Sequence, residues 1–586
     1  MSKITSRAYD PGTFQVLSNS GLSPVLARIY AARGIENAAQ LETELAHLIP
    51  FQQLKNVTET AVILADAIGA QKRLLIVADY DSDGATACAV GLRILRKLGA
   101  IVDYLVPNRF EFGYGLTPEI VHLAHDTKQP DILITVDNGI ASVEGVAEAN
   151  RLGMQVIVTD HHLPGDVLPE ARSIVNPNQP GCSFSSKSIA GVGVIFYLML
   201  ALRAELRQRG AFTASGQEPN LAHYLDLVAL GTVADVVKLD SNNRILVQQG
   251  LQRIRSGRAC AGIKALLQIS GRDCRQVSTY ELGFMLGPRL NAAGRLDDMS
   301  LGIECLTTDD EAAAVSMAAQ LDELNRQRRE IESGMQESAL IKLESELKSR
   351  QTEIQSAYSI CLFDPDWHQG VIGILASRIK DKYHRPVIIF ASGNDGEIKG
   401  SGRSINGFHL RDALDIVSKR HPELILKFGG HAAAAGLTIP AQAFGRFCDV
   451  FEQVAQSLLS PADLTRIIET DGDLALSEIN LELADFLDRQ VWGQGFPQPT
   501  FNGRFYVESQ RIVGEKHLKL RLKKIDSNHS GQAMRKSPDV YDGILFFHNN
   551  PLPDIIEAVY RLQVNEYNGK TSLQFLLEHW FQADNR

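Results

Sequence analysis

The stretch LLIVADYDSDGATACAVGLRILRKLG, residues 74–99, decides the fold. Its first five residues form a short apolar run typical of a buried strand, and residues 86–99 have the periodicity of a helix that ends at a glycine. Further strands are expected at IVDYLVP, at ILITV (132–136) and at MQVIVT (154–159), with a helix before the last of them. Strands that alternate with helices in this way predict a doubly wound, mostly parallel α/β sheet.

The rest of the chain predicts a multidomain protein, because 586 residues exceed what one hydrophobic core holds. About 40 residues after Thr308 contain no proline and one glycine, Gly334, and Thr308 and Glu311 have the capping-box spacing that marks a helix start. This predicts a long connecting helix, with two antiparallel helices broken near Gly334 as the alternative. A second α/β lobe follows. The C-terminal part is β-rich, with a hairpin signal at Asn568–Gly569, and predicts an OB-like barrel.

The expected domains are a helical N-terminal segment (1–50), a first α/β domain (51–305), the long helix (306–352), a second α/β lobe (353–460) and the OB-like barrel (461–586).

Composition excludes several classes of protein. The net charge of −10 excludes a uniformly basic nucleic-acid binder but not a local basic track. The seven cysteines are scattered without a CxxC pair, which argues against a zinc knuckle or a disulfide framework and for a reducing cytoplasm. The N-terminus has no secretory apolar region, and no apolar run approaches the roughly 20 residues of a membrane span. We therefore expect a cytoplasmic protein.

Acidic and imidazole side chains follow three of the expected strands. The carboxyl ends of parallel strands lie along one edge of a sheet, so these groups should converge there. Crowded carboxylates repel one another unless cations neutralise them, and carboxylates with imidazole suit Mn²⁺ or Mg²⁺. Two such ions can activate water and stabilise the leaving oxygen of a phosphate ester. The groups are Asp79, Asp81, Asp83, Asp137, Asp160, His161 and His162, with Asp235 in LGTVADVV as a further candidate.

Each of these elements alone has a structural alternative. The sequence DYDSDG could be a turn capped by its own aspartates, Asp160 and Asp235 could cap helices, and a lone histidine is more often structural than a ligand. Three successive strands that end in this way favour metal-dependent chemistry.

DYDSDG, VDNG, TDHH and ADVV resemble the four motifs of the DHH phosphoesterase superfamily. The resemblance implies that the metal ligands are Asp81, Asp83, Asp137, His161 and Asp235. It also implies that Asp79 is a ligand or a neighbouring carboxylate and that His162 lies near the scissile phosphate. Asp79, Asp160 and His162 are the expected catalytic residues.

Further stretches resemble the RecJ family of exonucleases within this superfamily: VPNRFEFGYG, SIAGVGVIF, GPRLNAAGR and, in the second lobe, DWHQGVIGILASRI, GSGRS and GGHAAAAG, typical of a DHHA1 domain. The resemblance runs from about Leu74 to the C-terminus, with Ser82 at a position where the family commonly has alanine. It implies a 5′→3′ exonuclease on single-stranded DNA that releases 5′-mononucleotides with two Mn²⁺ or Mg²⁺ ions and serves DNA repair and recombination.

Two groups of side chains are candidates for binding the DNA. The candidates for phosphate contacts are Arg109, Arg289, Asn291, Arg295, Ser401, Arg403 and His431, and those on the basic strand KHLKLRLKK are Lys519, Arg521 and Lys523. Each stretch also has a structural alternative: core packing with salt bridges for GPRLNAAGR, a tight helix start for GGHAAAAG and a solvated edge for the basic strand.

The expected partners are single-stranded DNA, a single-strand-binding protein and a helicase, and the chain is expected to be a monomer. Two other functions remain open: a DHH phosphodiesterase acting on short oligonucleotides or cyclic dinucleotides, and a non-enzymatic replication scaffold. The absence of a G-x-x-x-x-G-K-[ST] loop argues against a P-loop nucleotide hydrolase.

Overall fold

The computed structural model describes residues 2–107, 115–213, 217–350, 356–394, 396–525, 537–567 and 569–583. The chain forms two compact units. The core unit consists of Thr5–Gly294, Asp298–Asp322 and Glu469–Arg586, and the lobe unit of Met1–Ile4, Arg295–Asp297 and Glu323–Ile468. The five expected domains are a finer division, and their boundaries stay a prediction.

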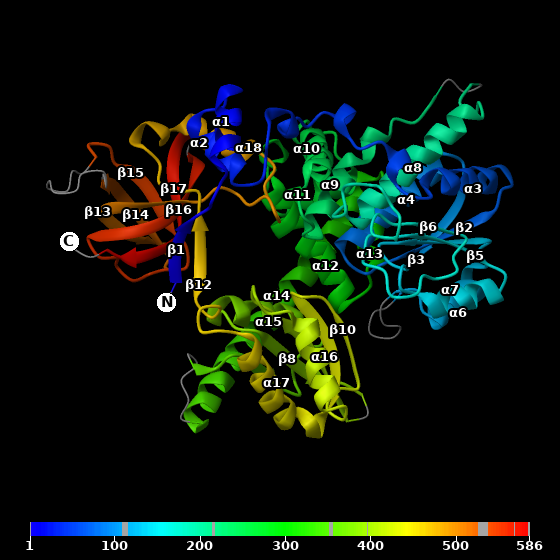
Figure 1. Ribbon diagram of the computed structural model, residues 1–586. Helices are drawn as coiled ribbons and strands as arrows, with labels where there is room; N and C mark the ends of the chain where they lie inside the picture. Colours follow the sequence, from blue (N-terminus) through cyan, green and yellow to red (C-terminus); the bar gives the residue numbers. More distant parts are fainter. Residues whose placement is uncertain are drawn as a thin grey trace. The chain divides into compact units, whose positions relative to one another are not determined.

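The core unit contains the predicted doubly wound sheet, and its five strands are all parallel (Figure 1). Their order is β3 (Ile101–Leu105), β2 (Arg73–Ala78), β4 (Ile132–Val136), β5 (Gln155–Thr159) and β6 (Ser173–Val175).

Helices cover both faces of this sheet. Leu75 and Val77 pack with residues of α6 (Pro118–Lys128) and α7 (Val143–Arg151), whereas Ile76 on the other face lies against α4 (Ser82–Lys97) and α8 (Gly191–Gln208). α3 (Val57–Gly69) also packs against α8. This alternation along β2 is what a strand buried on both faces requires.

A helical layer continues the core unit beyond the sheet. It consists of α9 (Leu225–Ala234), α10 (Ser241–Arg255), α11 (Ala261–Ile269), a π-helical turn (Glu281–Leu286), α12 (Gly287–Leu296) and α13 (Ser300–Thr307).

The N-terminal segment is helical at α1 (Pro11–Asn19) and α2 (Pro24–Ala31). It also contains a strand that the sequence reading missed, β1 (Ser2–Ser6), which pairs with β12 (Arg466–Thr470).

The long helix is continuous. α14 spans 40 residues, Glu311–Arg350, without a break at Gly334, so the alternative of two antiparallel helices is wrong. The predicted capping box is also wrong: the carboxylate of Asp310 accepts hydrogen bonds from the amides of Ala312 and Ala313 and caps the helix. Thr308 instead ends α13, because Asp310 stands one residue before the helix and reaches its free amides first.

The lobe unit contains a mixed five-stranded sheet, in which β7 and β8 are parallel and the remaining pairs antiparallel. Its order is β10 (Lys427–Gly430), β11 (Ala434–Pro440), β9 (Glu397–Arg403), β8 (Val387–Ser392) and β7 (Ile360–Phe363). Its core also includes residues of α16 (Leu410–Arg420) and α17 (Phe444–Leu458), and α15 (Ile372–Tyr383) packs on β8 and β9.

The C-terminal residues form the predicted barrel, seen in orange to red in Figure 1. The hairpin at its end pairs Tyr567 with Lys570, as its sequence signal predicted, although Asn568 lies outside the described residues. α18 (Leu481–Arg489) packs against β16. The closed strand order is β13 (Phe501–Val513), β14 (His517–Ile525), β15 (Tyr541–Leu545), β17 (Lys570–Gln582) and β16 (Ile555–Tyr567).

No helix among the described residues combines the length and the hydrophobicity that crossing a bilayer requires.

Candidate metal centre

The loop between β2 and α4 carries the first three acidic side chains. Oδ1 of Asp81 accepts hydrogen bonds from the amides of Asp83 (2.9 Å) and Gly84 (3.1 Å), so Asp81 caps α4. The helix consequently begins at Ser82, four residues before the predicted Thr86. The capped-turn alternative is therefore realised, but it does not compete with metal binding, because an ionised carboxylate has lone pairs for several partners.

Asp83 is fully buried and is held by the first turn of α8. Its two carboxylate oxygens accept hydrogen bonds from the amides of Gly191 (2.6 Å) and Val192 (2.9 Å). A helix N-terminus stabilises negative charge, so this turn fixes the carboxylate in place. The sequence reading did not find these donors, although the small residues of SIAGVGVIF were a signal for close approach.

Asp137 follows β4 with its backbone in the left-handed region, at φ 62°. This conformation is uncommon outside glycine and tends to occur at functional sites. A Cβ on Gly191 would lie 2.6 Å from Cβ and Oδ1 of Asp137, so only glycine fits beside this side chain. The same helix start therefore packs against both Asp83 and Asp137.

Asp160 orients the two histidines that follow it. Its Oδ1 accepts hydrogen bonds from the amides of His161 (2.7 Å) and His162 (3.1 Å) and lies 2.7 Å from Nδ1 of His162. Its Oδ2 accepts from the amide of Ile140. Asp160 is thus a positioning residue at the centre of the TDHH motif rather than a helix cap.

His161 faces three carboxylates from three different elements. Its Nε2 lies 3.0 Å from Oδ1 of Asp137, 3.5 Å from Oδ2 of Asp235 and 3.9 Å from Oδ2 of Asp83. Asp235 stands at the end of α9, before Val236, whose φ of 63° is unfavourable for a β-branched residue. The cluster therefore gathers side chains separated by about 150 residues in the sequence.

The crowding of these carboxylates shifts their protonation. Burial, reinforced by neighbouring aspartates, raises the pKa values of Asp83 and Asp137 well above their ordinary value. The same causes raise the pKa of Asp235 to about 7. Without a cation in the cluster, these carboxyl groups are therefore shifted toward their protonated form.

The two histidines shift in opposite directions. Burial lowers the pKa of His161 to about 4, so this imidazole is neutral at pH 7 and can act as a ligand. Burial also opposes the charged form of His162, but its hydrogen bond and charge interaction with Asp160 outweigh that effect and raise the pKa of His162 to about 9.

Divalent cations fit this set of donors. Three groups of side chains bring ligand atoms within 4.8 Å of one another: Asp79, Asp81 and Asp137; Asp83, His161 and Asp235; and Asp137, His161 and His162. Nε2 of His161 and Oδ2 of Asp235 are buried and have no hydrogen-bond partner among the described residues. The donors are oxygen and imidazole nitrogen, which suit Mn²⁺ or Mg²⁺. All eight acidic and imidazole residues proposed from the sequence lie in this one region.

The core-unit candidates for phosphate binding are mostly engaged in structural contacts. Oδ1 of Asn291 accepts from the amide and the hydroxyl of Ser82 and so supports the metal-binding loop. Arg289 is buried, and its guanidinium contacts the carboxylate of Asp322. Arg109 lies outside the described residues, and Arg295 belongs to the lobe unit, where it donates to the carbonyl of Gly370.

The remaining phosphate candidates lie together in the lobe unit. Ser401 and Arg403 are on β9, and Nη1 of Arg403 lies 3.3 Å from the hydroxyl of Ser401. Arg403 pairs across the sheet with Ala434, and His431 is exposed in the turn just before this residue. GGHAAAAG thus forms the end of β10, a turn and the start of β11, and the alternative of a helix start is wrong.

The basic strand has the predicted alternation. Leucines 518, 520 and 522 of β14 are buried in the barrel, while Lys519, Arg521 and Lys523 point outward. Acidic neighbours partly neutralise this row: Glu508 contacts Arg521 and Lys523, and Asp542 lies 3.8 Å from Nζ of Lys519. The buried Lys524 instead contacts Asp473.

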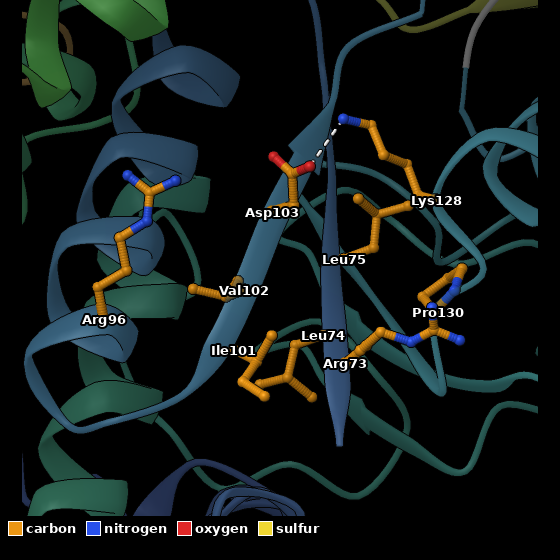
Figure 2. Close-up of a pocket in the computed structure, with 9 residues that line it drawn as sticks. All are labelled: Arg73, Leu74, Leu75, Arg96, Ile101, Val102, Asp103, Lys128 and Pro130. Atoms are coloured by element: carbon orange, nitrogen blue, oxygen red, sulfur yellow. Dashed lines mark hydrogen bonds and ion pairs between the residues drawn. The ribbon is translucent and has the colours of Figure 1, made fainter. Parts of the chain in front are cut away.

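A separate cavity of about 360 Å³ lies at the opposite edge of the parallel sheet. Figure 2 shows it at Arg73 and Ile101, where β2 and β3 begin, with Lys128 paired to Asp103 at one side. The acidic cluster follows the other ends of these strands, so this cavity does not belong to the metal centre.

Comparison with known families gives matches to three domain models along the chain. Residues 73–232 match the DHH family N-terminal domain, residues 354–457 the DHHA1 domain and residues 470–579 the RecJ OB domain.

Named relatives match over nearly the whole chain. The single-stranded-DNA-specific exonuclease RecJ of Dickeya dadantii is 50% identical over 99% of both chains, and that of Escherichia coli is 48% identical over 95% of this chain and 96% of its own.

A solved structure, that of RecJ from Thermus thermophilus in complex with Mn²⁺, covers 99% of this chain and 79% of its own at a TM-score of 0.80 and 29% identity. The corresponding Mg²⁺ complex matches at a TM-score of 0.75 and 27% identity. Because relatives named RecJ are about half identical over nearly the whole chain, the solved RecJ fold matches, and three domain models match along the sequence, the chain belongs to the RecJ family of single-stranded-DNA-specific exonucleases.

Proposed function

We propose that this chain is a metal-dependent exonuclease that degrades single-stranded DNA from the 5′ end and releases 5′-mononucleotides. The observation that carries the proposal is the convergence of the acidic cluster and His161 at one edge of the parallel sheet, in a chain that belongs to the RecJ family. DNA repair and recombination are the processes we expect it to serve.

Asp81, Asp83, Asp137, His161 and Asp235 are the proposed ligands of two divalent cations, with Asp79 as a further ligand or neighbouring carboxylate. When bound, Mn²⁺ or Mg²⁺ would activate water and neutralise charge on the phosphate ester. The chain's contribution is to fix the ligands: the α8 amides hold Asp83, the left-handed backbone directs Asp137, and Asn291 holds the loop through Ser82.

His162 is the proposed contact to the scissile phosphate. Because its pKa is about 9, it carries a positive charge at neutral pH, and Asp160 fixes the direction of its ring. A positioned imidazolium can donate a hydrogen bond to a phosphate oxygen and stabilise the charge that develops there.

The lobe unit is the proposed site of end recognition. A 5′-terminal phosphate carries more negative charge than an internal one, and Ser401, Arg403 and His431 offer hydroxyl, guanidinium and imidazole donors to it. Arg109, Arg289 and Arg295 remain candidates for contacts to the backbone, although Arg289 would have to share or leave Asp322.

The barrel favours a polymeric substrate over a short or cyclic one. Its basic row on β14 suits the backbone of a longer single strand. A non-enzymatic scaffold is disfavoured because the full set of ligand side chains is present and brought together.

The polarity is tested with circular single strands, 3′-tailed duplexes and 5′-tailed duplexes, each incubated with the enzyme and Mn²⁺ or Mg²⁺. We expect mononucleotides from the 5′-tailed duplexes only, and none after excess EDTA. Efficient degradation of circles, or of 3′ tails in preference to 5′ tails, would exclude the proposed polarity while leaving the metal site unaffected.

We further propose that the enzyme is a cytoplasmic monomer that acts with a helicase and a single-strand-binding protein. A helicase produces the single strand that this reaction consumes. The seven cysteines are all free in the structure, in keeping with a reducing compartment.

A further inference from the structure

The cavity at the edge of the parallel sheet where β2 and β3 begin has an excess of positive charge (Figure 2). Three cationic side chains line it from three different elements: Arg73 from β2, Arg96 from the last turn of α4 and Lys128 from the last turn of α6. Among the described residues that line the cavity, Asp103 on β3 is the only acidic one. The lining is therefore suited to an anion.

Two of the three cations have no anionic partner. Nζ of Lys128 lies 2.7 Å from the carboxylate of Asp103. Arg73 and Arg96 are exposed, and their guanidinium groups form neither a hydrogen bond nor an ion pair within the described part of the chain. A guanidinium group binds a phosphate through paired hydrogen bonds, so both side chains are available to a phosphorylated ligand.

The cavity also has an apolar wall. Leu74 and Leu75 of β2 and the nearby Pro130 are buried, whereas Ile101 on the edge strand β3 is 48% exposed. Aliphatic side chains of this kind pack against the flat face of a base or against a sugar ring and remove apolar surface from water. An inorganic ion would leave this wall unused.

Asp103 adds a hydrogen-bond acceptor beside this wall. Burial raises its pKa, but the hydrogen bond and the charge of Lys128, together with the charge of Arg96, outweigh this effect and lower the pKa below its ordinary value. The carboxylate is consequently ionised at neutral pH and can accept a hydrogen bond from an amino or hydroxyl group of a ligand.

The size of the cavity limits what it can hold. Its volume of about 360 Å³ is near the lower end of the roughly 300–1,000 Å³ that is usual for small-molecule sites. It therefore has room for one small ligand and not for a DNA strand. A phosphate monoester carries a charge of about −1.5 to −2 at neutral pH, which balances the two unpaired guanidinium groups.

We propose that this cavity is a binding site for a nucleoside monophosphate. The phosphate lies in the field of Arg73, Arg96 and Lys128, and the nucleoside packs against the apolar wall and donates a hydrogen bond to Asp103. The site goes beyond the proposed function and does not depend on it. A reaction that releases 5′-mononucleotides would, however, supply this ligand as its product.

The cavity and the metal centre lie at opposite ends of the same two elements. β2 begins at Arg73 in the cavity and leads directly to Asp79, while α4 begins after Asp81 at the metal centre and reaches the cavity with Arg96. Arg73 and Asp79 are about 20 Å apart along the strand, at ~3.3 Å per residue. A mononucleotide in the cavity therefore cannot contact the metal ligands.

The test is calorimetric titration of the full chain with dAMP, AMP, deoxyadenosine and inorganic phosphate, each with Mn²⁺ and again in excess EDTA. Removing the cation leaves the acidic cluster to repel a phosphate, so binding in EDTA reports on other sites. We expect dAMP to bind in both conditions, and deoxyadenosine and inorganic phosphate to bind about tenfold or more weakly, because each lacks half of the contacts. Tighter binding of dAMP than of AMP would identify the reaction product as the ligand's source, and the reverse order the ribonucleotides of the cell; either order supports the site.

Variants locate the binding. Arg73→Gln and Arg96→Gln should each weaken dAMP binding by about tenfold or more, the usual size of a charge-assisted hydrogen bond. Lys97→Gln is the matched control, because it removes the same charge from the neighbouring exposed position of α4 outside the cavity, and it should bind dAMP as the unmodified chain does. All three variants should degrade single strands at the unmodified rate when no mononucleotide is added.

Three results would overturn the proposal. Loss of dAMP binding in EDTA would place the nucleotide at the metal centre. Binding that persists unchanged in Arg73→Gln and Arg96→Gln would place it elsewhere on the chain. No binding of either nucleotide would mean that the cations only protect the exposed edge strand β3 from pairing with other chains. Because the titration needs no hydrolysis, a chain without exonuclease activity would contradict the proposed function and leave this test valid.

Discussion

The metal centre and the outer face of the barrel carry opposite charges and hold them in opposite ways. At the metal centre the carboxylates are buried, lie close together and receive no cationic side chain strong enough to keep their pKa values low. On the barrel Arg521 is exposed and Lys519 and Lys523 are partly exposed, and Glu508 and Asp542 already compensate them. One region requires a ligand to become electrostatically favourable, and the other does not.

This difference separates chemistry from attachment. A charge cluster in a low-dielectric site binds ions strongly and holds them in fixed geometry, as catalysis demands. An exposed row of cations exchanges counterions for phosphates without strain, so binding stays reversible and depends on salt. An exonuclease that degrades a polymer uses both properties, a rigid centre for the reaction and a surface that holds the strand reversibly.

The largest effect should follow from substitution within the cluster. Asp137→Asn should lower kcat by more than about 100-fold, since even supporting partners of metal ligands contribute 10- to 100-fold. The same substitution should raise the melting temperature in EDTA, because it removes one of several repelling carboxylates. Steady-state hydrolysis and thermal denaturation measure the two effects.

Asp381→Asn is the matched control, because Asp381 is exposed and forms a surface ion pair with Lys380. It should change neither quantity. An Asp137→Asn protein that is less stable in EDTA and still active would contradict the prediction that repulsion between these carboxylates destabilises the cation-free protein.

A smaller effect is expected on the barrel. Replacing Lys519, Arg521 and Lys523 together with glutamine should reduce the log–log salt slope of binding to long single strands by about two, at roughly 0.7 per lost phosphate contact. Glu508→Gln should strengthen binding, because it releases Arg521 and Lys523 from their ion pairs. Binding titrations from low to moderate salt measure both slopes. An unaltered slope in the triple variant would mean that the basic row is a solvated sheet edge that does not bind DNA.

The smallest effect concerns one partly buried carboxylate, Asp488, beside the barrel. Burial raises the pKa of Asp488 to about 6, although its Oδ2 accepts a hydrogen bond from the amide of Val564. A raised carboxyl pKa favours the folded state fully only below the unfolded value of about 4, and this contribution is lost as pH rises through about 6.

Asp488→Asn keeps an acceptor for Val564 and should therefore stabilise the protein by on the order of 1 kcal/mol above pH 6, with no gain below about pH 4. Melting temperatures across this pH range test it, with the exposed Asp554→Asn as control. A gain that is independent of pH would mean that packing, not charge, is responsible.

Much of the fold was predictable because its signals are local. The apolar runs of β2, β4 and β5 are buried on both faces, and the alternating leucines of β14 face the barrel interior, so continuous apolar runs identified the first three strands and alternation identified the fourth. Most of the acidic cluster was predictable for the same reason, since its members stand directly after the strands; Asp235, at the end of α9, is the exception.

What could not be predicted depends on contacts between distant segments. The amides that hold Asp83 lie 108 and 109 residues away in the sequence. Arg289 on α12 forms its ion pair with Asp322, which lies on another helix, α14. The ring contacts of His517, the first residue of β14, with Phe546 and Phe547 form only when β14 and β15 pair in register. Asp310, and not Thr308, caps α14, because two candidates only two residues apart competed for the same amides.

The wide separation of the cluster's residues also bears on how the protein is made. Asp79 to Asp83 leave the ribosome early, but Gly191, Asp235 and Asn291, which fix or complete this loop, follow more than 100 residues later. At ordinary rates of synthesis the loop therefore spends several seconds or more without its supports. The nascent chain cannot cut nucleic acid in that interval, and nuclease activity begins only when nearly the whole first domain has been synthesised and has folded.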